Sequence, residues 1–418
     1  DRSSIVDMPQ IVKPVIVPDA YKDVPIVKDM NIVPCMMSQV QFEKYAEAWE
    51  REKSMDKGRV MRQEDDDAYH YHTRTRQACN IVFRKDDFRT MKIKTKEDAK
   101  EADDLKQQTY SQLLETKDLS FDNDLKYVSP KMYQILKNMK KFTPEGRSTG
   151  KVLFYSDFRS DAGSEAFEVV LKSNGYERFD ADNPPKETGL RYTFITGSEP
   201  TEERRRNKEY YNADKNKYGE YVQIMIISSA GAEGISLTCV RQVHILEPYW
   251  NYVRIDQVLG RAIRMRSHNA LDKKDRNVEQ YMYLSILPYG STMEEIFETV
   301  KNNKEWTTST GIPVDSWTDV KAELAKEIYK SVRDLFETII RINMDTSGTS
   351  VDQELFQVMD QKYQVSQEIV SAIQESSIDC IQHTRDNPQL NDRCVRFTER
   401  ARLLDTPFEY TNIVQTEL

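Results

Sequence analysis

The stretch DQVLGRAIRMR (256–266) contains residues whose types and spacing suit the handling of a phosphoryl group. Arg261 and Arg264 are three positions apart, so on one helix their guanidinium groups leave the same face. Gln257 lies one turn before Arg261. Two fixed cations side by side match the oxygens of a transferring γ-phosphate, whereas an isolated pair of helical arginines is more often ordinary surface charge. The stretch therefore predicts a phosphoryl site only if the fold places it at a cleft.

A second stretch, SSAGAEGISL (228–237), is rich in small residues. It follows an apolar run and contains Gly231 and Gly234. Small residues let the backbone approach a phosphate or a ribose, with hydroxyl and N–H groups as donors. Glycines after a strand are also ordinary turn residues. The functional interpretation of this stretch is favoured by its position shortly before the arginines in the sequence.

Apolar runs indicate the strands that must position these two stretches, at 151–158, 191–197, 222–229, 240–247 and 278–287. Helical patterns lie between them at 166–176, 202–212 and 255–264, and Gly175 can end the first of these. Strands and helices that alternate with short links form parallel sheets with helices on both faces. The sequence therefore predicts an α/β fold.

The flanks of this α/β part differ from it in composition. Residues 1–34 combine prolines with valine and isoleucine, which indicates an extended edge or linker segment at the entry to the fold, not a helix. Residues 35–126 indicate a helical, charged, insertion-rich segment, with Ser38 as a helix cap. We expect the α/β lobe to cover 127–290 and a helical C-terminal extension to cover 291–418.

Amphipathic stretches predict helices in these flanks, because apolar residues recur on one face. KTKEDAKEADDLK (94–106) predicts a solvated helix. The predicted buried faces are Phe42, Tyr45, Ala46 and Trp49; Met132, Ile135, Leu136 and Met139; Val320, Leu324, Ile328, Leu335, Ile339 and Ile340; and Leu355, Phe356, Met359, Tyr363 and Ile369.

Composition narrows the class of protein. With 60 Lys and Arg against 69 Asp and Glu, the net charge of −9 does not support bulk electrostatic binding of nucleic acid, although a local basic channel would suffice. The 5 scattered cysteines lack a CxxC pair, which argues against disulfides or a zinc site and favours a reducing compartment. We expect no metal site, membrane span or signal peptide. The first residue is not methionine, which suggests a processed product or part of a longer protein.

Three stretches together resemble the C-terminal RecA-like lobe of superfamily 2 helicases. KVLFYSDF (151–158) is similar to their motif IV, SSAGAEGISL to motif V and QVLGRAIR (257–264) to motif VI. The segments PCMMSQVQFEKY, LKYVSPKMYQIL and VHILEPYWN resemble a large-DNA-virus group that includes the poxvirus-type early transcription factor small subunit and nucleoside triphosphatase I. The resemblance implies a RecA-like parallel sheet with helices on both faces, a helical insertion and a helical C-terminal extension.

The resemblance also implies roles for individual residues. Arg264 would be the arginine finger, Arg261 its companion at the γ-phosphate, and Gln257 would orient them or the attacking water. On the nucleotide side, it implies Glu233, Gly234 and Ser236 near the ribose and the cleft between lobes. Candidates for contact with the tracked strand are Ser156, Thr196, Gly197, Ser228, Ser229, Trp250 and Asn251. Simple core packing is an equally good interpretation of Trp250.

Such ATPases also need a GK[ST] phosphate loop and an acidic pair that holds magnesium. The closest string, GRSTGK (146–151), has its glycines too close together and Val152 where a metal-binding hydroxyl is required. Lys151 would open a strand, whereas a phosphate-loop lysine opens a helix. EDDD (64–67) follows no strand. We therefore expect ATP with Mg²⁺ as cofactor, the magnesium being held by a separate N-terminal RecA-like lobe, and the isolated chain to be inactive.

The sequence favours the C-terminal half of an ATP-dependent nucleic-acid translocase in viral transcription. Its expected partners are the N-terminal lobe, DNA or RNA, and RNA polymerase or a second transcription factor subunit, in the virion core or host cytoplasm. One alternative is a non-catalytic docking module that binds polymerase or virion proteins. Another is a replication or recombination helicase of the same superfamily.

Overall fold

A computed structural model describes most of the central part of the chain. The described residues are 10–11, 30–56, 72–84, 95–139, 150–197, 199–228, 235–264, 266–288, 335 and 337–376. The EDDD run (64–67), the glycine loop 229–234 and the predicted helix face Val320, Leu324 and Ile328 lie outside these residues. The chain forms two compact units, Asp1–Phe356 and Gln357–Leu418.

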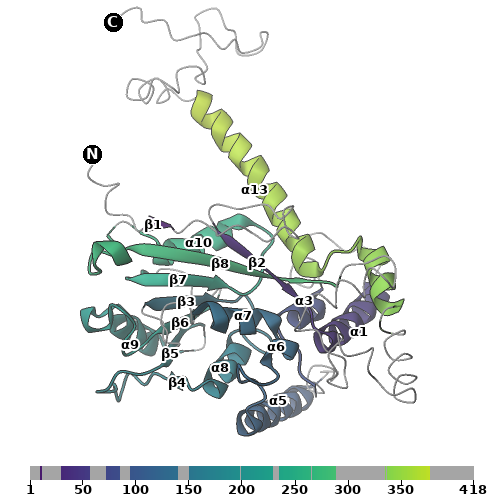
Figure 1. Ribbon diagram of the computed structural model, residues 1–418, viewed down its shortest axis with the longest axis horizontal. Coiled ribbons are helices and arrows are strands. Elements are labelled where there is room, and N and C mark those ends of the chain that lie inside the picture. The colour runs from purple at the N-terminus through teal and green to yellow at the C-terminus, as the bar shows by residue number, and fades with distance from the viewer. Residues whose placement is uncertain are drawn as a thin grey trace, which may run out of the picture. The chain divides into compact units, whose positions relative to one another are not determined.

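A parallel sheet forms the centre of the unit that ends at Phe356 (Figure 1). Its strand order is β1-β8-β7-β3-β6-β5-β4, and β2 also pairs with β8. The strands are β1 (Gln10–Ile11), β2 (Asn31–Met36), β3 (Lys151–Tyr155), β4 (Glu177–Arg178), β5 (Arg191–Ile195), β6 (Ile224–Ile227), β7 (Val240–Ile245) and β8 (Asn277–Ile286). All described pairings are parallel. The α/β fold and its five predicted strands are confirmed.

The central strands β3, β6 and β7 are buried along their whole length. Continuous apolar strands are expected where helices cover a parallel sheet. The crossover helices are α8 (Ser164–Ser173), α9 (Thr201–Asn212) and α10 (Tyr252–Ala262). Gly175, with φ +82°, follows the end of α8 in the left-handed conformation that stops a helix. The predicted end of that helix is confirmed.

The N-terminal segments share the core of the sheet. β2 runs beside β8, from Asn31 opposite Tyr281 to Met36 opposite Ile286. Ser38 caps α1 (Gln39–Asp56) through its Oγ, which accepts a hydrogen bond from Gln41 N at 3.1 Å. The predicted buried face of α1 is confirmed, and it belongs to the same apolar cluster as the strands of the sheet.

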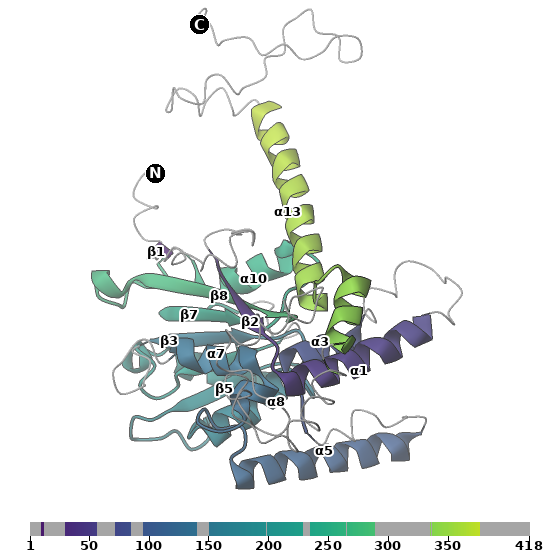
Figure 2. The same cartoon turned by 45° about the vertical axis from the view of Figure 1, so that its right-hand side comes forward.

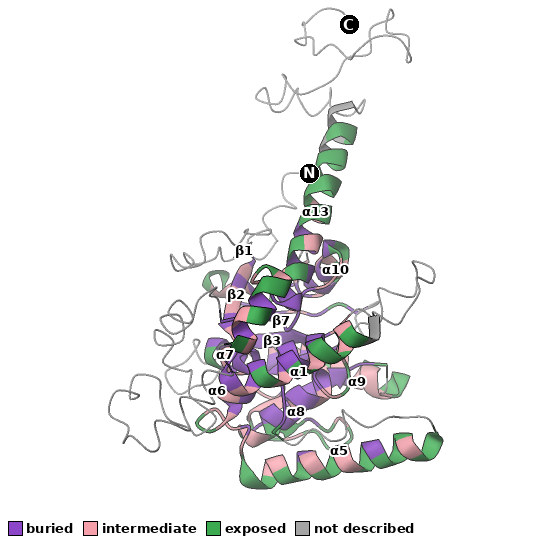
Figure 3. Cartoon of the chain, turned by 90° about the vertical axis from the view of Figure 1, so that its right-hand side faces the viewer, coloured by how far each residue is buried: buried purple, intermediate pink, exposed green. Residues whose placement is uncertain are grey.

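Further helices complete this unit: α3 (Thr73–Asn80), α5 (Lys96–Thr116), α6 (Leu125–Val128) and α7 (Pro130–Met139), with short 3-10 turns at Asp214–Asn216 and Lys273–Asp275. The buried face predicted for α7 is confirmed. α5 begins with a capping box of Thr95 and Asp98 and packs against α8 (Figures 1 and 2). Most of α5 is exposed, as expected for a solvated helix (Figure 3).

The C-terminal region is helical at 337–346 and in α13 (Val351–Ser376). Leu335, Ile339, Leu355 and Phe356 are buried as predicted. Ile369 is 55% exposed, so the prediction of a buried face is wrong at this position. Within the described ranges, no helix is long and apolar enough to cross a membrane.

Candidate functional site

The helix that carries the predicted motif VI is shorter than the sequence suggests. α10 begins at the cap Asn251, whose Oδ1 accepts a hydrogen bond from Arg254 N at 3.3 Å, and ends at Ala262. Ile263 is extended. Arg264 therefore lies beyond the helix, and the prediction that both arginines share one helical face is wrong.

The side chain of Arg264 contacts the last turn of α10. Its Nε donates to Gly260 O at 2.6 Å, the carbonyl that a continuing helix would offer to the Arg264 backbone N–H. The backbone N–H instead donates to Ser267 Oγ at 3.3 Å. At Gly260 O, the side chain of Arg264 therefore donates where the backbone N–H of a continuing helix would.

Both arginines nevertheless reach the same segment, residues 235–238, which leads into β7. Arg264 Nη1 donates to Ser236 Oγ, and Arg261 Nη1 donates to Ile235 O at 3.5 Å. The backbone also joins here, because Leu237 N donates to Arg261 O at 2.9 Å. The structure therefore brings Arg261, Arg264 and Ser236 together, by a route other than a common helix face.

Asn212, at the end of α9, holds this segment from another side. Its Nδ2 donates to Ser236 O at 2.9 Å, and its Oδ1 accepts from Thr238 N at 3.0 Å. The side-chain amide thus pairs with residues 236 and 238 as a neighbouring strand would, while residue 237 pairs with Arg261. Sequence reasoning missed Asn212, because an asparagine at a helix end is an ordinary stop signal.

Ser267 and His268 form a second support beneath Arg264. His268 Nε2 lies 2.7 Å from Val240 O, so it is the donor, and Nδ1 accepts from Ser267 Oγ at 2.8 Å. Burial lowers the pKa of His268 to about 4, which keeps the ring neutral. Ser267 O in turn accepts from Cys239 N at 2.9 Å. No spacing signal in the sequence links these residues to Arg264.

Of the other residues predicted near the nucleotide, Gln257 and Arg261 are described by the structure and two are not. Gln257 is exposed on α10, one turn before Arg261. Arg261 itself is partly buried, and its Nε has no hydrogen-bond partner among the residues that the structure describes. Glu233 and Gly234 lie outside those residues.

The candidates for nucleic-acid contact follow the ends of β3, β5, β6 and β7, which meet at the carboxyl edge of the parallel sheet. Gly197 is exposed, and Ser228 is buried. Thr196 donates through N and Oγ1 to Glu199 Oε2, at 2.7 and 2.6 Å. Ser229 lies outside the described ranges.

Three other candidates at this edge have structural partners. Ser156 is fully buried, and its Oγ donates to Glu247 Oε1 at 3.0 Å, so contact with a phosphodiester would first break this bond. Trp250 is partly buried against the apolar core, in line with the core-packing interpretation. Asn251 caps α10.

Lys151 is the first residue of the strand β3, whereas the lysine of a phosphate loop would begin a helix. It is fully buried, and its Nζ donates to Tyr211 O at 2.6 Å. Burial lowers its pKa to about 8. Lys151 is therefore bonded inside the fold at the opposite end of β3 from Ser156.

Residues 132–266 match the model of the helicase conserved C-terminal domain. The chain is 33% identical over 190 aligned residues to a termination factor NPH-I homolog of African swine fever virus, covering 38% of this chain and 26% of that protein. A putative ATP-dependent RNA helicase of Acanthamoeba polyphaga mimivirus is 31% identical over 160 residues, with the same coverage. Among solved structures, the C-terminal part of the Fun30 ATPase domain has a TM-score of 0.38 at 15% identity, covering 79% of this chain and 99% of that chain.

Residues 132–266 thus form a helicase conserved C-terminal domain, built on the parallel sheet described above. The chain is homologous to the African swine fever virus termination factor homolog and to viral helicases. It spans about a quarter of the length of these curated relatives, 26% in each case.

Proposed function

We propose that the chain is the C-terminal half of an ATP-driven nucleic-acid translocase that serves viral transcription. One observation carries this proposal. Within the helicase domain, the side chains of Arg261 and Arg264 converge on the segment 235–238. The homologous protein of African swine fever virus is named a termination factor, which supports a role in transcription.

In this proposal Arg264 is the arginine finger and Arg261 its companion, while Gln257 orients them or the attacking water. ATP bound with Mg²⁺ by an N-terminal lobe would present its γ-phosphate to them. Charge on the phosphate oxygens would be met by the Arg264 guanidinium, which is already held by Gly260 O and Ser236 Oγ, so little reorganisation is needed during the reaction. Arginine fingers of this kind accelerate hydrolysis roughly 10³- to 10⁵-fold.

The nucleic acid, DNA or RNA, would follow the carboxyl edge of the sheet, where Gly197 and Asn251 are the exposed candidates among the described residues. RNA polymerase or a second transcription factor subunit is the proposed protein partner, in the virion core or host cytoplasm. One alternative is a non-catalytic docking module, and another is a replication or recombination helicase. The experiment below distinguishes a docking module from an ATPase.

The test combines the purified chain with an N-terminal RecA-like lobe that carries a GK[ST] phosphate loop and measures Mg²⁺-dependent ATP hydrolysis with and without nucleic acid. We expect no turnover by the chain alone and restored turnover in the mixture. Arg264→Ala should abolish turnover while sparing most ATP binding, and Arg264→Lys should not rescue it, because lysine lacks the planar fork. Turnover that survives Arg264→Ala would favour the docking module.

A matched control keeps the test specific. Arg205 is an exposed arginine on α9, paired with Glu202 and Glu209. Arg205→Ala removes one cation of the same type from the same lobe, and we expect turnover within about twofold of the parent, as for a surface pair.

A further inference from the structure

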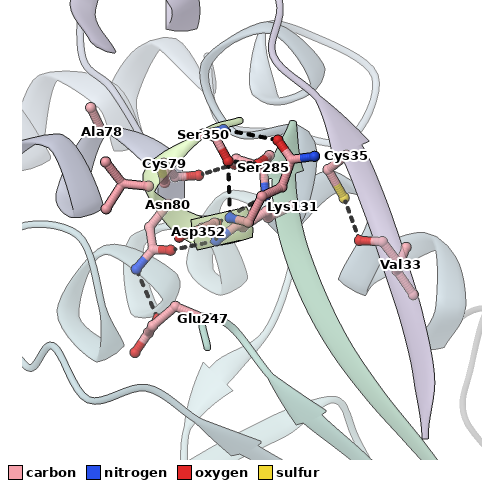
Figure 4. A network of polar contacts seen from close by, with 12 residues as sticks. Val33, Cys35, Ala78, Cys79, Asn80, Lys131, Glu247, Ser285, Ser350 and Asp352 are labelled. Carbon is pink, nitrogen blue, oxygen red and sulfur yellow. Dashed lines mark hydrogen bonds and ion pairs between the residues drawn. The ribbon is translucent and has the colours of Figure 1, made fainter. Parts of the chain in front are cut away.

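A chain of polar contacts, buried from Asp352 to Glu247 and partly exposed at Asp157 and Arg254, joins the first turn of α13 to the start of α10. Lys131 and Asp352 form an ion pair in which both side chains are at most 1% exposed. Lys131 Nζ also donates to Asn80 Oδ1 at 3.0 Å, and Asn80 Nδ2 donates to Glu247 Oε2 at 2.8 Å. Figure 4 shows these contacts, which come from α13, α7, α3 and the end of β7.

The chain of contacts continues from Glu247 to the helix of the arginines. Glu247 Oε1 accepts the backbone N–H of Asp157 at 2.5 Å as well as the hydroxyl of Ser156. Asp157 Oδ1 accepts from Arg254 Nη1 at 2.7 Å, and the Arg254 guanidinium lies over the Tyr249 ring at 4.3 Å. Arg254 is in the first turn of α10, whose other end carries Arg261.

The first turn of α13 is itself firmly attached to the sheet. Ser350 and Gln353 form a reciprocal cap, with Ser350 N donating to Gln353 Oε1 at 2.9 Å and Gln353 N donating to Ser350 Oγ at 3.2 Å. Ser285 N on β8 donates to Asp352 Oδ2 at 2.9 Å, and the Ser350 hydroxyl donates to Ser285 O. This turn therefore holds Asp352 in place between β8 and Lys131.

Stability alone does not account for such a pair. Two buried charges lose their hydration, and apolar residues of similar volume often serve a core equally well. A chain of hydrogen bonds and ion pairs does fix geometry, because each of these contacts requires a particular direction and distance. Here each contact joins two different elements, so a displacement of one element would be passed to the next along the chain of contacts.

We propose that Asp352 and Lys131 are positioning residues that hold the start of α10 through Asn80 and Glu247, so that the first turn of α13 and the arginine-bearing helix move together. This inference goes beyond the proposed function, since it concerns the folded chain whether or not the arginines meet ATP. A load or a partner acting on this turn of α13 would then change the placement of Arg254.

Hydrogen exchange of the 418-residue chain tests the proposal without nucleotide. Asn80→Ala cuts the contacts in the middle and leaves the Lys131–Asp352 pair intact. We expect exchange to rise at least about tenfold at the Asp157 amide and in 252–256, with no change at the Ser285 amide. A purely local structural role would raise exchange around Asn80 only, and unchanged exchange at Asp157 and 252–256 would overturn the proposal.

A second variant starts from the other end and avoids an unpaired buried charge. Lys131→Met combined with Asp352→Asn removes both charges, and the new asparagine can still accept the Ser285 N–H. We expect the melting temperature to change by a few degrees at most while exchange rises at Asp157 and 252–256. Glu354→Gln, an exposed change on the same turn, is the control and should alter neither segment. A rise confined to β8 and α13 would contradict the proposal.

Discussion

Asn212 provides the clearest case of a single side chain that organises the arginine site. Asn212→Ala removes its hydrogen bonds to Ser236 O and Thr238 N. We expect the free energy of unfolding to fall by about 1–3 kcal/mol, as for two lost hydrogen bonds. In the assembled ATPase, kcat should fall with little change in KM, because the segment that orients Arg264 loses one support.

Urea denaturation and steady-state kinetics measure the two effects. Asn183→Ala is the control, since Asn183 is an exposed asparagine whose Nδ2 donates only to Asp180 in the described contacts. An equal fall in kcat for both variants would remove Asn212 from the site.

Two buried titratable residues give the stability opposite dependences on pH. Burial raises the pKa of Glu247 from its usual 4.5 to about 7, with Lys131 opposing this, so its contribution to stability falls as the pH rises through that window. Burial lowers the pKa of His268 from 6.5 to about 4, so its contribution rises with pH between those values. Each amounts to roughly 3 kcal/mol, and they largely cancel between about pH 4.5 and 6.5.

Single variants should expose the two contributions. In urea denaturation across this range, we expect the stability of Glu247→Gln to rise more steeply with pH than that of the parent. The stability of His268→Gln should instead fall as the pH rises. Glu177→Gln, at an exposed carboxylate, should follow the parent curve. Curves for both buried-site variants that run parallel to the parent would contradict the assigned pKa directions.

At the scale of elements, two glycines with open space around them differ in backbone conformation, which is left-handed at Gly175 and helical at Gly260. Gly175 has φ +82° after α8, and an added Cβ there meets nothing within 4 Å. Gly260 lies within α10, also with nothing within 4 Å of an added Cβ. We expect Gly175→Ala to destabilise the chain by about 1 kcal/mol, and Gly260→Ala to stabilise it by about 0.5–1 kcal/mol.

Chemical denaturation of both variants measures this contrast, and each serves as the control for the other. A loss of stability in Gly260→Ala would show that the helix is not relaxed at that position. If Gly260→Ala gains stability yet lowers turnover in the assembled ATPase, the requirement for glycine there comes from outside the described lobe.

The elements of the central sheet could be predicted because each strand is a short apolar run between turn residues. β4 was not predicted, since its residues Glu177 and Arg178 are exposed and polar. The pairing of β2 could not be predicted either, because Pro34 favours an edge or a linker equally and only the fold places β8 beside it.

The candidate site was predictable only in part, for a related reason. Arg261, Arg264 and Ser236 could be found by motif spacing, which survives in the sequence. Asn212 and His268 act through contacts that exist only after the chain has folded. The sequence pattern continues helically to Arg264, whereas α10 ends at Ala262 and the Arg264 side chain donates to Gly260 O, and no helical periodicity encodes this end.

For the whole molecule, the shared core implies that the N-terminal helices and the sheet unfold together. Phe42 of α1 is fully buried in the same apolar cluster as Phe154 of β3 and Tyr283 of β8. We expect Phe42→Ala to cost about 3–5 kcal/mol and to shift one unfolding transition without splitting it.

Far-UV circular dichroism and tryptophan fluorescence, followed in the same urea titration, measure whether the transition stays single. Val253→Ala, at an exposed apolar side chain of α10, is the control and should change stability by less than about 0.5 kcal/mol. Two separate transitions, with only the first shifted by Phe42→Ala, would show that the N-terminal helices fold independently.

The pairing of β2 with β8 also determines how the lobe responds to force. β2 lies parallel to β8 over the register from Asn31 to Met36, and β8 is fixed on its other side by β7. Tension applied to Asn31 along the strand axis loads these pairs in shear, so they share the load instead of opening one after another. Detaching β2 by such a pull therefore requires its pairs with β8 to break together.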